Sequence, residues 1–317
     1  MKTDGYLTTD LSLVADQAKE LEANGHLGAF TAETSHDPFL PLAIAAEHTS
    51  TIQLGTSIAV AFARNPMTLA YTARDLNEFS AGRMVLGLGS QIRPHITKRF
   101  SMPWSAPAGR MREFISAMHS IWDSWDAEAP LRFKGEHYTH ILMSDFFDPG
   151  PATHGRPDVY LAAVGPMMVR VAAEICDGWM VHPFVTPSYF HDVALPRFRT
   201  FMDDAERAHE LCQVSLPAFV VTGADDAEMA ASTARIKQQI GFYGSTPAYQ
   251  EVLEHHGWAE AHTELNAMTK TRRWDELGDV IDDEMLATFA VVAEPDNVEA
   301  ELQARYGQTV DRISQYT

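Results

Sequence analysis

Two segments of the sequence carry side chains suited to proton transfer. Glu33 and His36 lie in the stretch ETSHDP (33–38), directly after an apolar run at 28–32 that predicts a β-strand. Histidine titrates near neutral pH and can donate or accept a proton. His182 follows another short apolar run, at 179–181. We expect His36 to transfer the proton, with Glu33 or His182 orienting it; the alternative is that His36 only caps the next helix.

Two further segments have the composition of an anion-binding site. Gly89-Ser90-Gln91 ends a predicted strand, and the run RPHITKR (93–99) that follows it is the densest basic cluster of the chain. Val164-Gly165-Pro166-Met167 leads from another predicted strand into a helix. Proline in a first helical turn leaves free N–H groups at the positive end of the helix, where a phosphate binds well. The Gly-x-Gly spacing at 87–89 does not continue into a dinucleotide-binding fingerprint.

Other catalytic classes fit the sequence poorly. A metal-dependent barrel hydrolase carries histidine ligands at the end of its first strand, whereas the run at 3–7 is followed by threonines. Glycosidases need two carboxylates at strand ends, and Glu33 is the one well-placed acid. A Gly-x-Ser-x-Gly nucleophile motif is absent, and the two cysteines lack metal-type spacing. We expect no metal.

The elements that position these residues alternate between strand and helix. Apolar β-type runs occur at 3–7, 28–32, 51–60, 83–88, 158–162, 179–181, 214–221 and 285–292, and amphipathic helical segments lie between them, with a closing helix at 297–306. Eight such units predict a (β/α)₈ TIM barrel, with function in the loops that follow the strands. A doubly wound sheet is the alternative, but it normally has fewer strands or a linker. We expect a single domain over 1–317, with long additional segments at 91–106, 127–157 and 243–283.

Composition limits the partners. The chain has 24 basic and 43 acidic side chains, a net charge of −19. Such a surface repels phosphate backbones and anionic lipid, so we expect neither nucleic acid nor membrane as a partner. The sequence has no signal peptide pattern and no apolar stretch long enough to span a bilayer. We therefore expect a cytoplasmic location.

Five segments resemble the luciferase-like monooxygenase superfamily, most closely its coenzyme F420-dependent (deazaflavin) oxidoreductase branch. They are AETSHDPFLPLAIAAEHT (32–49), IQLGTSIAVAFARNPMTLA (52–70), SAGRMVLGLGSQIRPHITKRFSMPW (80–104), YLAAVGPMMVRVAAEICDGWMVHPF (160–184) and FYGSTPAY (242–249). The segments spread over most of the chain, and those around 84–91 and 161–166 are the specific ones. The resemblance implies a TIM barrel with insertions after strands 3, 4 and 7.

The resemblance also implies roles for individual residues. Ser57-Ile58 stands where such proteins often carry a non-prolyl cis peptide in a bulge that supports the cofactor ring. Ser90 and Gln91 match positions near the ring and its ribityl chain, and Val164, Gly165, Pro166 and Met167 match the phosphate-binding turn. Gly89 and His182 are further candidates to bind the cofactor. His36 matches a position at the barrel mouth near ring or substrate. Phe62, Trp104 and Phe184 are candidates to line the substrate pocket; the alternative is core packing.

The implied activity is hydride transfer between coenzyme F420 and a small organic substrate. Relatives that use a sugar phosphate carry an acidic residue where this chain has Ile92, and no basic trio for a substrate phosphate is found. We therefore expect an uncharged substrate. One alternative is an FMN-dependent monooxygenase that takes electrons from a flavin reductase partner. Another is a non-catalytic flavin- or deazaflavin-binding protein. Because relatives are often dimers, we expect a homodimer.

Overall fold

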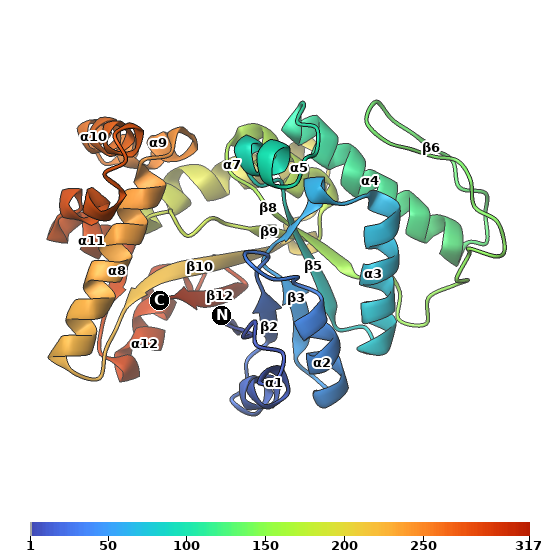
Figure 1. The fold of residues 1–317 in the computed structure, drawn as a ribbon, viewed down its shortest axis with the longest axis horizontal. Coiled ribbons are helices and arrows are strands. Elements are labelled where there is room, and N and C mark those ends of the chain that lie inside the picture. The colour runs from blue at the N-terminus through green and yellow to red at the C-terminus, as the bar shows by residue number, and fades with distance from the viewer. Residues whose placement is uncertain (1) are drawn as a thin grey trace.

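Eight parallel strands close into a barrel in the computed structural model, which describes residues 2–317 (Figure 1). In order around the barrel they are β1 (Lys2–Tyr6), β2 (Gly28–Thr31), β3 (Gln53–Thr56), β5 (Met84–Gly89), β8 (Asp158–Ala162), β9 (Gly178–Met180), β10 (Gln213–Val221) and β12 (Arg312–Tyr316). Pairing of β9 with β10 and of β12 with β1 completes the closure. The expected TIM barrel is confirmed.

Helices cover the outside of the barrel in chain order. They are α1 (Val14–Ala23), α2 (Leu40–His48), α3 (Pro66–Phe79), α4 (Pro107–Asp126), α5 (Pro166–Ile175), α6 (Pro187–Tyr189), α7 (Leu195–Asp204) and α12 (Val298–Tyr306). Consecutive helices pack against each other from α1 to α5, and α5 packs against α7. Their apolar faces and the outer face of the sheet form one large core. No helix within residues 2–317 is both long enough and apolar enough to span a membrane.

The predicted eighth strand at 285–292 is wrong. Most of that segment is helix α11 (Asp283–Phe289), and only β11 (Val291–Val292) is extended, pairing with the end of β10. The Asp282 side chain caps α11 by accepting a hydrogen bond from the Met285 N–H (2.8 Å), which favours helix over strand. The strand that closes the barrel is β12, so the predicted closing helix, α12, precedes the last strand.

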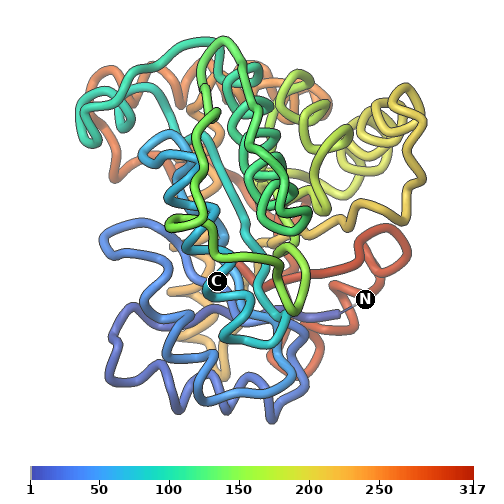
Figure 2. Tube along the Cα trace, turned by 90° about the vertical axis from the view of Figure 1, so that its right-hand side faces the viewer, coloured from blue at the N-terminus to red at the C-terminus, as the bar shows by residue number. Residues whose placement is uncertain are grey.

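Two long segments interrupt the β/α repeat on opposite sides of the barrel (Figure 1). After β10 come α8 (Asp226–Gly244), α9 (Gln250–His255), α10 (Ala259–Lys270) and α11. After α4, residues 127–157 form an excursion with the small hairpin of β6 (Phe133–Lys134) and β7 (Thr139–His140), which runs along α4 (Figure 2). A third long loop, 90–106, joins β5 to α4. After the third strand, residues 61–65 lead from β4 (Ala59–Val60) directly into α3, so the insertion expected there is only a short 3₁₀ turn.

The barrel interior is filled from one end. Phe30, Val85, Tyr160 and Met180 form a small apolar cluster inside the strands. Below them, at the start of β12, the Arg312 guanidinium makes a buried ion pair with Asp4, with Nη2 2.7 Å from Oδ1. These side chains close the N-terminal end of the barrel. Binding space is therefore left at the opposite end, the barrel mouth, where the C-terminal ends of the strands meet.

Candidate active site

One wall of the barrel mouth is a bulge between β3 and β4. The Ser57–Ile58 peptide bond is cis, as the resemblance implied. The Ser57 N–H donates to the Thr31 carbonyl oxygen (2.6 Å), which ties the bulge to β2. Gly89 of β5 faces the bulge so closely that an added Cβ would stand 2.8 Å from Cδ1 of Ile58. A glycine is therefore required at position 89 for the Ile58 side chain to occupy this wall.

Glu33 holds this wall in place. Its carboxylate Oε2 accepts hydrogen bonds from the Val60 N–H (2.7 Å) and from Nη1 of Arg64 (2.5 Å), and its own N–H donates to the Ile58 carbonyl oxygen (3.1 Å). Its side chain is only 9% exposed. Within residues 2–317 it shares no hydrogen bond with His36. Glu33 thus links its own loop to the backbone of Val60 and to Arg64, and its role as an orienting group for His36 stays a prediction.

His36 lies on the same loop as Glu33 but faces solvent. Its side chain is exposed and has no hydrogen-bond partner within the described chain. The cap of α2 comes from the neighbouring Asp37, whose Oδ1 accepts from the Phe39 N–H (2.8 Å). The alternative reading of His36 as the helix cap is therefore wrong. An exposed, unpaired imidazole at the mouth is free to exchange a proton with a bound molecule.

The loop after β5 brings positive charge to the mouth. Gln91 adopts a left-handed backbone (φ 58°), and the Ser90 hydroxyl donates to its carbonyl oxygen (3.1 Å). The basic side chains Arg93, Lys98 and Arg99 that follow are exposed. Arg99 donates from Nη2 to the Thr34 carbonyl oxygen, which ties this loop to the loop that carries His36. The chain, acidic overall, therefore keeps an anchored cationic segment beside the mouth.

The turn between β8 and α5 has the features of a phosphate site. Gly165 caps the helix with a positive φ of 73°, and apart from its chain neighbours no residue within 2–317 comes within 4 Å of where its Cβ would stand. Val164, Pro166 and Met167 are exposed. Within residues 2–317 the N–H groups of Gly165, Met167 and Met168 have no acceptor. Free N–H groups at the positive end of a ten-residue helix attract an anion.

His182 stands at the end of β9 between two tyrosine rings. It stacks on Tyr249 (ring centroids 4.4 Å apart) and meets the edge of Tyr243 (4.6 Å). Burial lowers the pKa of His182 to about 3, so the ring is neutral at physiological pH. Its Nδ1 accepts a hydrogen bond from the Phe184 N–H (3.1 Å), which leaves the proton on Nε2. His182 is thus a neutral hydrogen-bond donor, which is unsuited to orienting a charged His36.

The three aromatic side chains predicted to line a substrate pocket separate into two groups. Phe62 is fully buried and packs edge-on against Trp104 (5.8 Å) with the Arg110 guanidinium over its ring (4.5 Å). Phe184 belongs to the group around His182 and packs on Phe289 (4.6 Å). Within the described chain no ring contact joins Phe184 to the other two. Phe62 and Phe184 are therefore both buried core residues, and Phe184 also lines a small cavity beside His182.

The sequence interpretation missed three polar residues of the mouth. Arg64 supports Glu33, and Tyr243 and Tyr249 enclose His182. Both tyrosines lie in the segment FYGSTPAY (242–249), which was recognised as resembling the superfamily but carried no assigned role. Their signal was the presence of two aromatic hydroxyl groups in an insertion that follows a barrel strand.

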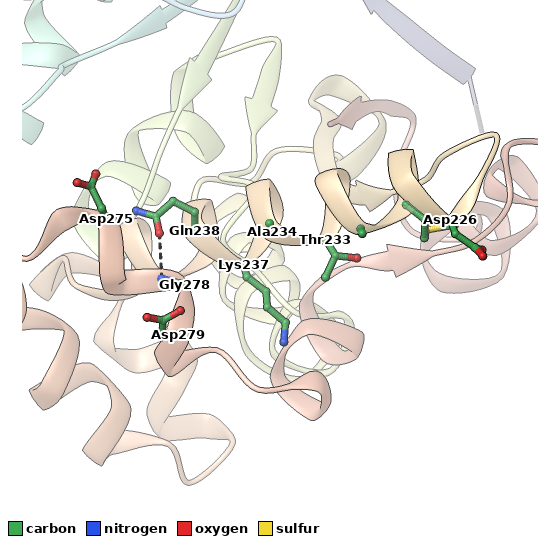
Figure 3. Close-up of a pocket in the computed structure, with 10 residues that line it drawn as sticks. Asp226, Thr233, Ala234, Lys237, Gln238, Asp275, Gly278 and Asp279 are labelled. Atoms are coloured by element: carbon green, nitrogen blue, oxygen red, sulfur yellow. Dashed lines mark hydrogen bonds between the residues drawn. The ribbon is translucent and has the colours of Figure 1, made fainter.

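Two other clusters of polar residues lie away from the mouth. A depression on α8 is lined by that helix and the 3₁₀ segment Trp274–Val280, where Gln238 Oε1 accepts from the Gly278 N–H (3.0 Å; Figure 3). None of its lining residues comes from a barrel strand. Glu113 of α4 lies close to Glu136 and His137 of the 127–157 excursion, but its carboxylate already accepts hydrogen bonds from three N–H groups of the hairpin, those of Glu136, His137 and Tyr138. Neither cluster serves the barrel mouth.

Comparison with known proteins agrees with the sequence resemblance. A family model described as luciferase-like monooxygenase matches residues 2–312. An uncharacterized protein of Mycobacterium tuberculosis is 49% identical over 313 residues, which cover 99% of this chain and 92% of that protein. The 5,10-methylenetetrahydromethanopterin reductase of Archaeoglobus fulgidus is 27% identical over 264 residues, covering 81% of this chain and 74% of the reductase.

Solved structures share the fold at low sequence identity. The coenzyme F420-dependent tetrahydromethanopterin reductase of Methanopyrus kandleri superposes with a TM-score of 0.79 at 20% identity, covering 99% of this chain and 92% of that one. An F420-dependent secondary alcohol dehydrogenase gives 0.76 at 15% identity, covering 99% and 93%. The EDTA monooxygenase of a Chelativorans species gives 0.73 at 15% identity, covering 99% and 88%. Reductases and monooxygenases therefore share this barrel.

Proposed function

The chain belongs to the luciferase-like monooxygenase family, and from that membership we propose that it is a coenzyme F420-dependent oxidoreductase. It passes a hydride to or from a small, uncharged organic molecule at the barrel mouth. The observation that carries the choice of cofactor is the anchored basic loop at 93–99. FMN ends in a single phosphate, whereas coenzyme F420 continues into an acidic oligoglutamate tail. A cationic segment on a chain of net charge −19 suits the longer anion.

The residues at the mouth fit such a cofactor. The wall of Ile58 and Gly89 presents backbone and one aliphatic side chain, which suits packing against the face of a tricyclic ring. The free N–H groups after Gly165 suit its phosphate. When bound, a deazaflavin supplies a two-electron hydride carrier that reacts poorly with oxygen. The task of the protein is then to orient the substrate and to move one proton.

His36 is the residue to which we assign that proton. Its imidazole is exposed at the mouth and makes no hydrogen bond within residues 2–317. We expect His36→Ala to slow single-turnover hydride transfer by about 10²-fold or more, the usual contribution of a general acid or base. The dissociation constant of the cofactor should stay within twofold. Hydride transfer at the full rate in His36→Ala contradicts the assignment.

A binding titration tests the choice of cofactor. The purified chain is titrated with coenzyme F420, with the same ring and ribityl chain lacking phosphate and tail, and with FMN. We expect coenzyme F420 to bind at least tenfold more tightly than either. The double variant Arg93→Gln, Lys98→Gln should weaken coenzyme F420 and leave the tail-less form unchanged, because both side chains are exposed.

The other outcomes of the titration identify the alternatives. Tighter binding of FMN than of coenzyme F420 indicates an FMN-dependent monooxygenase that needs a flavin reductase partner. Binding of coenzyme F420 without turnover of any carbonyl compound or alcohol indicates a non-catalytic carrier. Uptake of none of the three molecules overturns the proposed function. Sedimentation of the same sample tests whether the chain is a homodimer.

A further inference from the structure

A small apolar pocket opens beside the phosphate turn, between the end of β9, helix α7 and helix α9. Its cavity volume is about 60 Å³. One water molecule needs on the order of 15 Å³ by the same measure, so the pocket holds a short hydrocarbon branch and not a ring system. Most of the side chains that line it are aliphatic or aromatic, among them Trp179, Val181, Phe184, Val185, Tyr249 and Val252.

The one cation that lines this pocket is already neutralised. Arg197 of α7 makes a bidentate contact with Glu251 of α9, with Nη2 2.6 Å from Oε1 and Nη1 3.2 Å from Oε2. The Tyr189 hydroxyl donates to the same carboxylate (2.9 Å). A substrate carboxylate or phosphate in the pocket would have to displace Glu251, and it would meet the negative charge of Glu251. The pocket therefore favours an uncharged group.

His182 supplies a hydrogen-bond donor at the inner side of the pocket. Its Nδ1 is occupied by the Phe184 N–H, and its ring faces are covered by Tyr249 and Tyr243. Nε2 has no hydrogen-bond partner within residues 2–317 and remains accessible to solvent. The Nε2–H group can therefore reach an incoming oxygen. Carbonyl and hydroxyl oxygens both accept such a bond.

We propose that this pocket selects the substrate: it takes the aliphatic branch of an uncharged ketone, or of the matching secondary alcohol, whose oxygen accepts a hydrogen bond from His182. The inference rests on the proposed function and names its substrate class. In the reducing direction the carbonyl carbon gains a hydride, the C=O π bond breaks, and the oxygen gains a proton. The reduced deazaflavin is the co-reactant that loses this hydride and one proton, so atoms and electrons balance.

A matched pair of probes tests the pocket without any cofactor. In 4-methyl-2-pentanone and 4-methyl-2-oxopentanoate the same isobutyl branch is attached to a carbonyl group that bears a methyl or a carboxylate. Saturation-transfer NMR on the cofactor-free chain should show contact with the branch methyl groups of the ketone, and at least fivefold less with those of the oxo acid. Equal contact with both probes, or contact with neither, overturns the proposal.

Two tryptophan substitutions locate the contact. Ala248 is exposed at the rim of the pocket, so Ala248→Trp covers it without disturbing the core. Ala230 is exposed in the depression on α8 and provides the control. The ketone signal should be lost in Ala248→Trp and kept in Ala230→Trp. A signal that survives Ala248→Trp shows that the ketone binds elsewhere and contradicts the assignment.

Glu251→Gln tests the role of charge. The amide keeps the shape and an acceptor oxygen for Tyr189 but leaves Arg197 without a counter-charge. We expect the oxo acid to bind at least tenfold more tightly to this variant than to the wild type, while binding of the ketone changes less than twofold. If the oxo acid bound no more tightly to Glu251→Gln than to the wild type, the Arg197–Glu251 pair would not be the reason why the pocket prefers an uncharged group.

Turnover separates failure of this inference from failure of the proposed function. If coenzyme F420 binds and methyl ketones are reduced, KM should fall at least fivefold from acetone to 4-methyl-2-pentanone in the wild type but not in Ala248→Trp. The dissociation constant of coenzyme F420 should be the same in both. A KM unaffected by the branch, or weaker cofactor binding by Ala248→Trp, shows that the pocket serves another ligand group, such as the cofactor tail. If the chain does not bind coenzyme F420, the proposed function fails, and the NMR experiment on the cofactor-free chain still tests whether the pocket binds the ketone.

Discussion

Glu33 and Arg64 form an ion pair that also fixes the wall of the barrel mouth. The same oxygen, Oε2 of Glu33, accepts from Nη1 of Arg64 and from the N–H of Val60, directly beyond the Ser57–Ile58 bulge. Removal of this carboxylate leaves the Val60 N–H without its acceptor and leaves Arg64 with only the Val60 carbonyl oxygen and the more distant Asp37 carboxylate. The pair therefore links the loop of His36 to the surface on which we place the cofactor ring.

Loss of Glu33 should cost both stability and cofactor binding. We expect Glu33→Ala to lower the free energy of unfolding by about 2–3 kcal/mol, since two partly buried donors lose their acceptor. Coenzyme F420 should bind about tenfold more weakly, a change of about 1.4 kcal/mol. Urea unfolding and a fluorescence titration measure the two effects.

Asp37→Asn is the control for Glu33. Asp37 lies 3.6 Å from Arg64 and is 47% exposed, and an exposed ion pair contributes only about 0–1 kcal/mol. Asparagine keeps the Oδ1 acceptor for the Phe39 N–H. If Asp37→Asn lost as much stability and cofactor affinity as Glu33→Ala, negative charge near Arg64 would explain the effect, and the hydrogen bonds of Glu33 to Val60 and Arg64 would not.

Gly89→Ala should distort the wall itself. The new Cβ would meet Ile58 at 2.8 Å from Cδ1 and 2.9 Å from Cγ1, so the Ile58 side chain must move. Overpacking of this kind costs about 1–3 kcal/mol. We expect weaker binding of coenzyme F420 and of its tail-less form alike, because the ring contact is affected. Gly109→Ala on α4 has open space around its Cβ and should leave both titrations unchanged.

The missed closing strand shows where sequence patterns stop being informative. β12 reads RISQY, and its first inward-facing residue is Arg312, which is only 1% exposed. A buried arginine contradicts the apolar alternation by which strands are recognised. Its counter-charge, Asp4, is 308 residues away in the sequence. The pairing that makes the strand possible is therefore a property of the closed barrel.

Within the site, local motifs were predictable and long-range contacts were not. The bulge at Ser57–Ile58 and the turn at Gly165 depend on short segments, and both were expected where the structure has them. Tyr249 covers His182 from an insertion that has no β/α period, so neither charge nor spacing connected the two residues. The ion pair of Glu33 with Arg64 was not predicted, because Arg64 lies on another loop and residue spacing did not connect the two.

The Asp4–Arg312 pair should stabilise the barrel only as a pair. Asp4→Ala leaves a buried guanidinium without its counter-charge, which costs about 3–5 kcal/mol. The double variant Asp4→Leu, Arg312→Met removes both charges and should recover most of that loss. Chemical denaturation of the two proteins measures the difference. If the double variant is as unstable as Asp4→Ala, geometry and not charge explains the cost.

Stability should fall in mild acid because His182 resists protonation. Burial lowers its pKa to about 3 in the folded chain, against about 6.5 in an unfolded one. Between those values the unfolded chain binds more protons, so stability decreases as pH falls from about 6.5, by up to about 1.4 kcal/mol per pH unit. His119, whose pKa burial lowers to about 4, acts in the same direction.

His182→Asn should remove one part of this pH dependence. The asparagine Oδ1 can still accept from the Phe184 N–H but does not titrate. Guanidinium unfolding at pH 7.5, 6.0 and 5.0 should therefore show a smaller loss of stability with falling pH in the variant. The part of the loss that comes from His119 should remain. If stability fell with pH equally in the variant and the wild type, the pKa of His182 would not differ between the folded and the unfolded chain.

Gly165→Ala should separate phosphate binding from ring binding. Gly165 has φ 73° and ψ 152°, a conformation open almost only to glycine, so alanine costs about 1–3 kcal/mol or forces the turn to rearrange. An added Cβ would meet no atom within 4 Å outside the adjacent residues in the part of the chain that the structure describes, so backbone conformation and not crowding is the cause. Gly25→Ala is the control, because Gly25 has φ 78° and equally open surroundings in a loop that does not belong to the mouth.

Both variants, Gly165→Ala and Gly25→Ala, should lose stability. Only Gly165→Ala should bind coenzyme F420 and FMN more weakly, by about tenfold or more, while its affinity for the ring lacking phosphate stays at the wild-type value. If Gly165→Ala lost affinity equally for all three molecules, the turn would contact the ring. If it lost affinity for none of them, the turn would not belong to the binding site.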